Sequence, residues 1–219
     1  FTATLEGRWQ LRYDLQLEAG VELNARADET AALSVGGVRD RLKLLAVATL
    51  TQQDSAALEL AAARYHDQSR GYLGQGQSVG IDLRHQFTRA WPDYGVRLYG
   101  GYSWYRSDGS VGAKMAALVP EDTDVTASFF VPQSFGHLGL GLFLGQTWKS
   151  GYTRDWKPFA EANVDWNSNS DFSFNYSLGL VGPLFGLDQL MLELTQSSGE
   201  FGVSDLTTTI SVNYRYLFK

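Results

Sequence analysis

The sequence predicts an all-β fold, an antiparallel transmembrane β-barrel with about eleven strands in residues 1–219. Three observations predict this fold. Apolar and polar residues alternate along eleven segments, tryptophans lie on the apolar side of these segments, and aromatic residues alternate up to Phe218 at the C-terminus. Alternation of this kind gives each strand one face for lipid and one face for water.

The first segment, residues 5–23, shows the alternation most clearly. Every odd position except Gly7 is apolar, and every even position is polar, charged or glycine. Because successive side chains of a strand point to opposite faces, the pattern predicts one strand with an apolar and a charged face. A strand this long is expected where barrel strands project beyond the bilayer.

Ten further segments repeat the alternation, and turn-forming residues separate them. Their apolar positions span residues 31–35, 42–50, 58–62, 79–87, 96–104, 138–148, 156–166, 172–180, 190–194 and 206–218. Turns are expected at residues 27–29, 54–55, 91–93, 168–171 and 185–188. No stretch shows convincing helical periodicity, so we expect strands throughout.

The positions of the aromatic residues favour a membrane barrel over a soluble β-sandwich. Tryptophan and tyrosine collect at the two membrane interfaces of a barrel, whereas a sandwich scatters them. Most tryptophans lie on the apolar face near a segment end: Trp9, Trp104, Trp148, Trp156 and Trp166. The alternating Tyr214, Tyr216 and Phe218 resemble the terminal strand of outer-membrane proteins. We therefore expect the bacterial outer membrane as the location.

Composition excludes several other classes of protein. The longest apolar run, residues 44–48, is far shorter than the about 20 residues of a transmembrane helix. The absence of cysteine excludes disulfides and thiolate metal sites. The net charge of −6 argues against a nucleic-acid partner, whose phosphates select basic surfaces.

The order of the connections predicts which of them face the cell exterior. If the last strand ends in the periplasm, the long connection of residues 107–134 is extracellular and the short connections near Asp54, Pro92 and Gly186 are periplasmic. The first strand would then begin on the extracellular side. We therefore expect further strands before Phe1, in a barrel of about 14 to 18 strands. A hairpin within residues 5–23 would remove this argument.

The polar face carries the candidate residues of an aqueous path. They are Asp14, Glu18, Glu22, Asp82, Tyr99, Glu161, Asp165 and Glu193. Acidic rings in a channel favour cations. The same face also carries arginines and lysines, so two interpretations stay open: general solvation by paired charges, and a selective acidic path. For Tyr99, stacking on a sugar ring and simple filling of space are both open.

The long connection of residues 107–134 is the candidate gate. It contains an apolar centre that a fully solvated loop does not need, which predicts a loop folded on itself or into the pore. Contact with lipopolysaccharide or with a neighbouring barrel is the alternative. The candidate gate residues are Leu118, Pro120, Glu121, Asp122, Asp124, Phe129 and Phe130.

Catalytic and metal-binding patterns are weak. None of the three histidines lies in a recognisable nucleophile motif, so we expect no enzyme activity. The acidic residues 121–124 contain the oxygen ligands that Ca²⁺ prefers, but a solvated acidic loop is the simpler interpretation. We therefore assign no metal and no cofactor.

Several segments from Val96 onward resemble the C-terminal barrel of the PelB-type exporters of Pel exopolysaccharide. They are Leu-Val-Pro at 118–120, Pro-Gln-Ser-Phe at 132–135, Tyr-Thr-Arg-Asp-Trp-Lys-Pro-Phe-Ala-Glu at 152–161 and Gln-Ser-Ser-Gly at 196–199. The resemblance implies a periplasmic tetratricopeptide-repeat region upstream and passive passage of a partly deacetylated, cationic amino-sugar polymer. The net charge of −6 suits such a polymer.

The alternation and the aromatic positions predict an outer-membrane barrel, and the resemblance implies that it is a channel that exports an exopolysaccharide during biofilm matrix formation. The expected partners are the polymer, outer-membrane lipid and lipopolysaccharide, and periplasmic polysaccharide-processing and export proteins. Two alternatives stay open: a general solute porin, and an exporter of cellulose or poly-N-acetylglucosamine type. A structural or adhesive barrel is a third class, and it predicts a sealed lumen.

Overall fold

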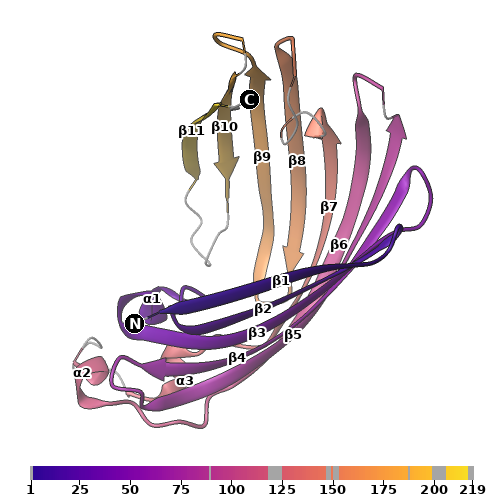
Figure 1. Ribbon diagram of the computed structural model, residues 1–219. Helices are drawn as coiled ribbons and strands as arrows, with labels where there is room; N and C mark the ends of the chain where they lie inside the picture. Colours follow the sequence, from indigo (N-terminus) through magenta and orange to yellow (C-terminus); the bar gives the residue numbers. More distant parts are fainter. Residues whose placement is uncertain are drawn as a thin grey trace. The chain divides into compact units, whose positions relative to one another are not determined.

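The computed structural model describes residues 2–88, 90–117, 125–146, 149, 153–186, 188–198 and 206–216. Within them the chain forms one sheet of eleven strands, in which each strand lies beside the next one in sequence (Figure 1). The strands are β1 (Ala3–Arg12), β2 (Leu15–Arg26), β3 (Gly37–Thr49), β4 (Asp54–Asp67), β5 (Tyr72–Thr88), β6 (Tyr94–Arg106), β7 (Phe135–Leu144), β8 (Lys157–Asn167), β9 (Ser170–Gly182), β10 (Asp188–Ser197) and β11 (Thr207–Tyr216).

Short helices lie in two of the connections between strands. Helix α1 (Ala31–Gly36) joins β2 to β3, and α2 (Ala113–Ala116) and α3 (Ala127–Phe130) lie between β6 and β7. None of the helices in the described residues is long and apolar enough to span a bilayer.

The strands form two compact units. Unit 1 comprises residues 1–49, 57–81 and 100–136, and unit 2 comprises residues 50–56, 82–99 and 137–219. Strands β4, β5 and β6 contribute residues to both units.

The prediction of one long strand over residues 5–23 is wrong. The segment is an antiparallel hairpin of β1 and β2, with Trp9 opposite Leu17 and Leu5 opposite Val21. In this register odd residues face odd residues, so the apolar face continues from one strand to the next without a break. The alternation therefore hides the turn at Tyr13 and Asp14.

The prediction of a strand at residues 31–35 is also wrong, because this segment is helix α1. The Thr30 hydroxyl caps the helix by accepting a hydrogen bond of 3.1 Å from the Leu33 amide. Leu33 is fully buried, so packing of this one side chain stabilises a helix of only six residues. The predicted strand at residues 5–23 is two strands, and the predicted strand at residues 31–35 is a helix. These two errors cancel in the total, and the predicted number of eleven strands is confirmed.

The assignment of an apolar outward face and a polar face is confirmed along the described strands. Leu5, Leu140, Leu178 and Ile210, from strands β1, β7, β9 and β11, are between 53% and 78% exposed. Large apolar side chains with this exposure need lipid rather than water as their surroundings. We call this the outward face. Trp148 and Phe218, which contributed to the sequence-based assignment, lie outside the described residues.

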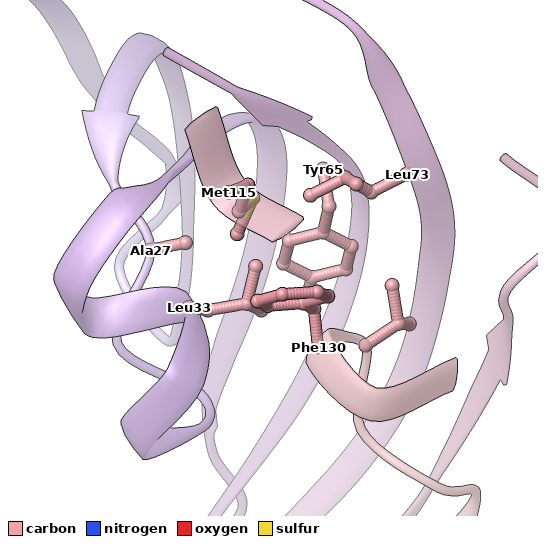
Figure 2. Packing of buried hydrophobic residues seen from close by; sticks show 7 residues of the cluster. Ala27, Leu33, Tyr65, Leu73, Met115 and Phe130 are labelled. Carbon is pink, nitrogen blue, oxygen red and sulfur yellow. The ribbon is translucent and has the colours of Figure 1, made fainter. Parts of the chain in front are cut away.

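The buried apolar cluster of unit 1 joins α1 to the long β6–β7 connection. It contains Ala27, Leu33, Tyr65, Leu73, Met115, Phe130 and Val131. Figure 2 shows Leu33 of α1, Tyr65 of β4 and Phe130 of α3 pointing toward one another. The Thr30 hydroxyl also donates to the Phe130 carbonyl at 2.8 Å, which links the two connections at the backbone.

Candidate channel lining

The predicted path residues all belong to the polar side of the strands or to one turn. Asp14 lies in the β1–β2 turn, and Glu18 and Glu22 follow on β2, in unit 1. Asp82, Tyr99, Glu161, Asp165 and Glu193 belong to β5, β6, β8 and β10 in unit 2. Strand pairing places Glu161 opposite Ser177 and Glu193 opposite Gly179, so polar and small residues surround these carboxylates.

Each predicted carboxylate of unit 1 forms a salt bridge with an arginine. Arg12 lies 3.3 Å from Asp14, Arg8 lies 2.8 Å from Glu18, and Arg39 lies 3.2 Å from Glu22. Lys43 and Arg41 pair with a further carboxylate, Glu59. This part of the polar face therefore carries alternating charges rather than a continuous acidic surface.

A hollow of about 400 Å³ lies on this part of the polar face. Its charged lining residues are Glu6, Arg8, Glu18 and Lys43, and its uncharged ones are Gly7, Ala19, Gly20 and Leu45. The hollow contains both signs of charge beside an uncharged floor. Such a surface offers weak contacts to a hydrated polar solute without a deep binding pocket.

Arg97 is the centre of the polar network in unit 2. Its guanidinium lies 2.5 Å from Asp82 and 3.8 Å from Glu161, and it stacks 4.3 Å above the centre of the Tyr99 ring. The Tyr99 hydroxyl donates a hydrogen bond of 2.5 Å to Asp165. One face of the Tyr99 ring is thus covered by Arg97, so this arrangement favours space filling over stacking on a sugar.

Glycines of β7 make room for this network. Gly139 lies under the Tyr99 ring, where a Cβ atom would be 2.5 Å from Cε2 of Tyr99 and 2.6 Å from Oδ1 of Asp165. A Cβ atom on Gly141 would collide with the side-chain oxygen of Asn163. The side chains of β6 can therefore reach across β7 to β8 only because β7 has no side chain at these positions.

The connection between β7 and β8 also contacts the polar face. Lys149 forms a 2.6 Å salt bridge with Glu193 of β10, and its ammonium lies 5.2 Å from the centre of the Phe159 ring. Gln146 donates to Glu161 at 3.2 Å. Phe159 is only 1% exposed, and the connection contributes to its cover. The contacts of Gln146 and Lys149 with the polar face were not predicted from the sequence.

The sequence analysis also missed the polar network around Arg39. Arg39 contacts Asp28 at 2.6 Å and Glu29 at 2.7 Å, in addition to Glu22, and the Tyr65 hydroxyl donates to Glu29 at 3.1 Å. This network lies beside the apolar cluster and ties the β2–β3 connection to β3 and β4. A basic residue on the polar face near a turn with two acids, Asp28 and Glu29, was the available signal.

The described part of the candidate gate is folded against the strands. Gly109 and Ser110 donate backbone hydrogen bonds to Leu73 and Tyr72 of β5, at 3.1 and 3.0 Å. Phe130 is buried in the apolar cluster, whereas Phe129 is 44% exposed. Five predicted gate residues lie outside the described residues: Leu118, Pro120, Glu121, Asp122 and Asp124. The role of this loop as a gate stays a prediction.

Metal-binding geometry is not found in the described part of the chain, where no three His, Asp or Glu side chains converge on one point. The acidic residues 121–124, considered above for Ca²⁺, lie outside this part.

Comparison with known proteins gives one family and a shared fold. The model of the family described as "PelB, C-terminal beta barrel domain" matches residues 1–217. The match extends the resemblance seen from Val96 onward to nearly the whole chain. No curated protein matches the sequence.

Two solved structures are similar to this chain. A bacterial polysaccharide outer membrane secretin superimposes with a TM-score of 0.64 at 10% identity, over 97% of this chain and 67% of that chain. The beta domain of the Bordetella autotransporter Brka gives a TM-score of 0.44 at 13% identity, over 99% of this chain and 91% of that chain.

Proposed function

The chain belongs to the family of PelB C-terminal β-barrel domains, and on this premise we propose that it forms the wall of a polysaccharide export channel. It is an antiparallel β-barrel domain of the bacterial outer membrane. The polymer we propose is a cationic amino-sugar polysaccharide of Pel type, secreted during biofilm matrix formation. The barrel serves as a passive conduit without a catalytic role.

One observation carries this proposal: in the described residues six of the seven path carboxylates pair with an arginine or lysine and remain partly exposed, and Asp165 accepts a hydrogen bond from Tyr99. Glu18 and Glu22 keep 29% of their side-chain surface exposed, and Glu161 keeps 27%. An unpaired buried carboxylate would hold a cationic sugar tightly. When a carboxylate that already has an arginine partner binds the cationic polymer instead, one ion pair replaces another. The net gain in binding free energy is small, because a partly exposed ion pair contributes little.

This exchange suits transport of a long polymer. Conduction needs binding sites that are favourable enough to enter and weak enough to leave. Alternation of Asp or Glu with Arg along the polar face provides many weak sites in series. The proposed path residues are Asp14, Glu18, Glu22, Asp82, Tyr99, Glu161, Asp165 and Glu193, with Tyr99 acting through Asp165 rather than by stacking.

The test is single-channel conductance of the full-length protein in a planar bilayer, with added sugar oligomers. Deacetylated glucosamine oligomers should block the current reversibly, whereas an anionic uronic-acid oligomer of equal length should not. Neutralisation of the path in the variant Glu161→Gln, Asp165→Asn, Glu193→Gln should shorten the blocking events. The control Asp155→Asn, an exposed residue of the β7–β8 connection, should leave them unchanged.

Other outcomes would favour other functions. Conductance that is indifferent to both oligomers would point to a general solute porin. Block by neutral and cationic oligomers alike would favour an exporter of cellulose or acetylated polymer. A complete lack of conductance, with a correctly folded barrel, would overturn the proposal in favour of a structural or adhesive barrel.

A further inference from the structure

The outward face of unit 1 changes from apolar to charged at the same end of three strands. Toward the β2–β3 and β6–β7 connections, the next residue on the same face is charged on each strand. Asp40 follows Leu42 on β3, Arg64 follows Ala62 on β4, and Arg106 follows Trp104 on β6. Two residues of a strand span about 6.6 Å, so the charged row begins about one lipid headgroup beyond the last apolar row. Tyr102 and Trp104 pack against each other at 4.7 Å and mark the interface on β6.

Loop length places this end of the strands on the cell exterior. The connections at this end include the β2–β3 segment with α1 and the long β6–β7 segment with α2 and α3. The connections at the other end of β1 to β4 are short, at residues 13–14 and 50–53. Outer-membrane barrels have short periplasmic turns and longer extracellular loops. The charged row therefore lies at the level of the outer leaflet, whose lipid is lipopolysaccharide.

The charged row is one connected cluster. Asp40 contacts Arg70 at 3.2 Å and His66 at 3.6 Å, and the His66 ring packs edge-on against Tyr72 at 6.1 Å. The Tyr72 hydroxyl donates to Asp108 at 3.0 Å, and Asp108 pairs with Arg106 at 2.9 Å. We call these residues, together with Arg64, the outer basic cluster.

The outer basic cluster has an excess of positive charge on a chain with a net charge of −6. Three arginines face only two aspartates, and Arg64 forms no salt bridge with any described residue. Arg64 is exposed, and the side chain of Arg106 is 72% exposed. The Arg64 guanidinium is thus available to an anionic ligand, and the Arg106 guanidinium stays largely exposed beside its partner Asp108. The planar guanidinium binds phosphate in a bidentate way.

A hollow of about 370 Å³ lies beside Arg64 on the outward face. Its apolar lining includes Val21, Leu23, Leu42 and Ala62, and its polar lining residues are Glu22, Asp40, Arg41, Arg64, Gln75 and Gln77. The small side chain of Ala62 leaves the space between Leu42 and Arg64 open. Along the bilayer normal, the hollow therefore changes from apolar to charged. A lipid changes in the same way where its acyl chains join the headgroup.

From these observations we infer that the outward face of β2–β6 binds lipopolysaccharide. A phosphate of its lipid anchor lies against Arg64 and Arg106, and an acyl chain enters the hollow above Ala62. A zwitterionic phospholipid lacks the net negative charge that the cluster selects, and it belongs to the other leaflet. This lipid site does not depend on which substrate the channel carries. Its test can therefore fail while the proposed function holds, and the reverse.

The test measures lipid binding to the purified full-length protein in detergent, by native mass spectrometry and by titration. The three lipids are bisphosphorylated lipid A, the same lipid A after enzymatic removal of its phosphates, and phosphatidylethanolamine. We expect the wild type to bind bisphosphorylated lipid A about tenfold more tightly than the other two, as one or two charge-assisted hydrogen bonds provide. The double variant Arg64→Ala, Arg106→Ala should lose this preference, and the control Arg154→Ala should keep it.

Further variants separate the site from a folding defect and from free phosphate. Ala62→Trp fills the hollow, keeps every charge and faces lipid, so the barrel should retain its heat-modifiable mobility on gels while its lipid A affinity falls. Inorganic phosphate at millimolar concentration should not displace lipid A. Equal binding of all three lipids, displacement by phosphate alone, or unchanged affinity in both variants would overturn the inference.

Discussion

Tyr99 of β6 and Asp165 of β8 are joined by a hydrogen bond that passes over an intervening strand. The Tyr99 hydroxyl lies 2.5 Å from Asp165, and β7 lies between the two strands with Gly139 under the aromatic ring. The bond therefore depends on a residue that takes no part in it. This relationship makes Gly139 a position of the polar face in unit 2 where a side chain would disturb a hydrogen bond between two other strands.

Replacement of Gly139 by alanine should destabilise the barrel. The added Cβ atom collides with both Tyr99 and Asp165, so one of them must leave its position, which costs about 1–3 kcal/mol. Urea unfolding in lipid vesicles, followed by tryptophan fluorescence, measures the change in free energy. The matched control is Gly80→Ala, because a Cβ atom there has no neighbour closer than 3.8 Å and the variant should unfold like the wild type.

Removal of the Arg97 charge should make the channel more cation-selective. Arg97 pairs with both Asp82 and Glu161, so Arg97→Gln leaves Glu161 without a guanidinium partner in the described residues and leaves Asp82 with Arg84 alone, at 3.3 Å. The reversal potential in a salt gradient should move toward the equilibrium potential of the cation. Arg154→Gln removes an equal charge from the β7–β8 connection and should leave the reversal potential unchanged. Equal shifts in the two variants would mean that only the net charge matters.

Two neighbouring phenylalanines should respond differently to truncation. Phe130 is 1% exposed in the apolar cluster, and Phe130→Ala should cost about 3–5 kcal/mol and release the β6–β7 connection. Phe129 is 44% exposed, and Phe129→Ala should cost much less. Limited proteolysis of intact cells measures the release, since a loop that leaves its cluster becomes accessible. Similar digestion of both variants would show that the cluster does not hold the loop.

A charge on the outward face should prevent stable insertion, whereas the same charge on the polar face should not. Leu140 of β7 is 58% exposed on the outward face, and Leu140→Arg places a cation in hydrocarbon at a cost of about 2–4 kcal/mol near the bilayer midplane. Ser211 of β11 lies opposite Glu193 on the polar face, so Ser211→Arg should be tolerated. A folded barrel changes its mobility on a gel when it is heated. The fraction of protein in outer-membrane extracts that shows this change compares the yields of the two variants. Equal yields would mean that the two faces are assigned wrongly.

The sequence analysis predicted the two faces of the strands well but two of its elements wrongly. The outward position of Leu140 and the polar position of Glu193 both follow from alternation along one strand. The hairpin of β1 and β2 did not follow, because its register pairs odd with odd residues and leaves the alternation unbroken. Helix α1 was missed because three alternating apolar residues fit either a strand or a short helix, and only the burial of Leu33 decides between them.

The candidate path could be predicted as a set of residue types but not as a set of contacts. The acidic residues of the polar face were identified by position alone. The pairing of Arg97 with Asp82 and Glu161, and of Lys149 with Glu193, required the structure, because these partners are separated by up to 64 residues and belong to different strands or connections. No local signal in the sequence marks Lys149 as the partner of Glu193.

The sequence by itself determined which side of each strand meets lipid and which side meets water, because alternate side chains of an extended chain must point in opposite directions. The alternation of side-chain direction follows from the covalent geometry of the extended chain. It does not depend on where the turns between strands lie. Only the tertiary structure decided which charges neutralise each other, which loop packs on Leu33 and Phe130, and which glycine lies under Tyr99. These depend on strand register and on contacts between distant segments, which the order of residues along one strand does not contain.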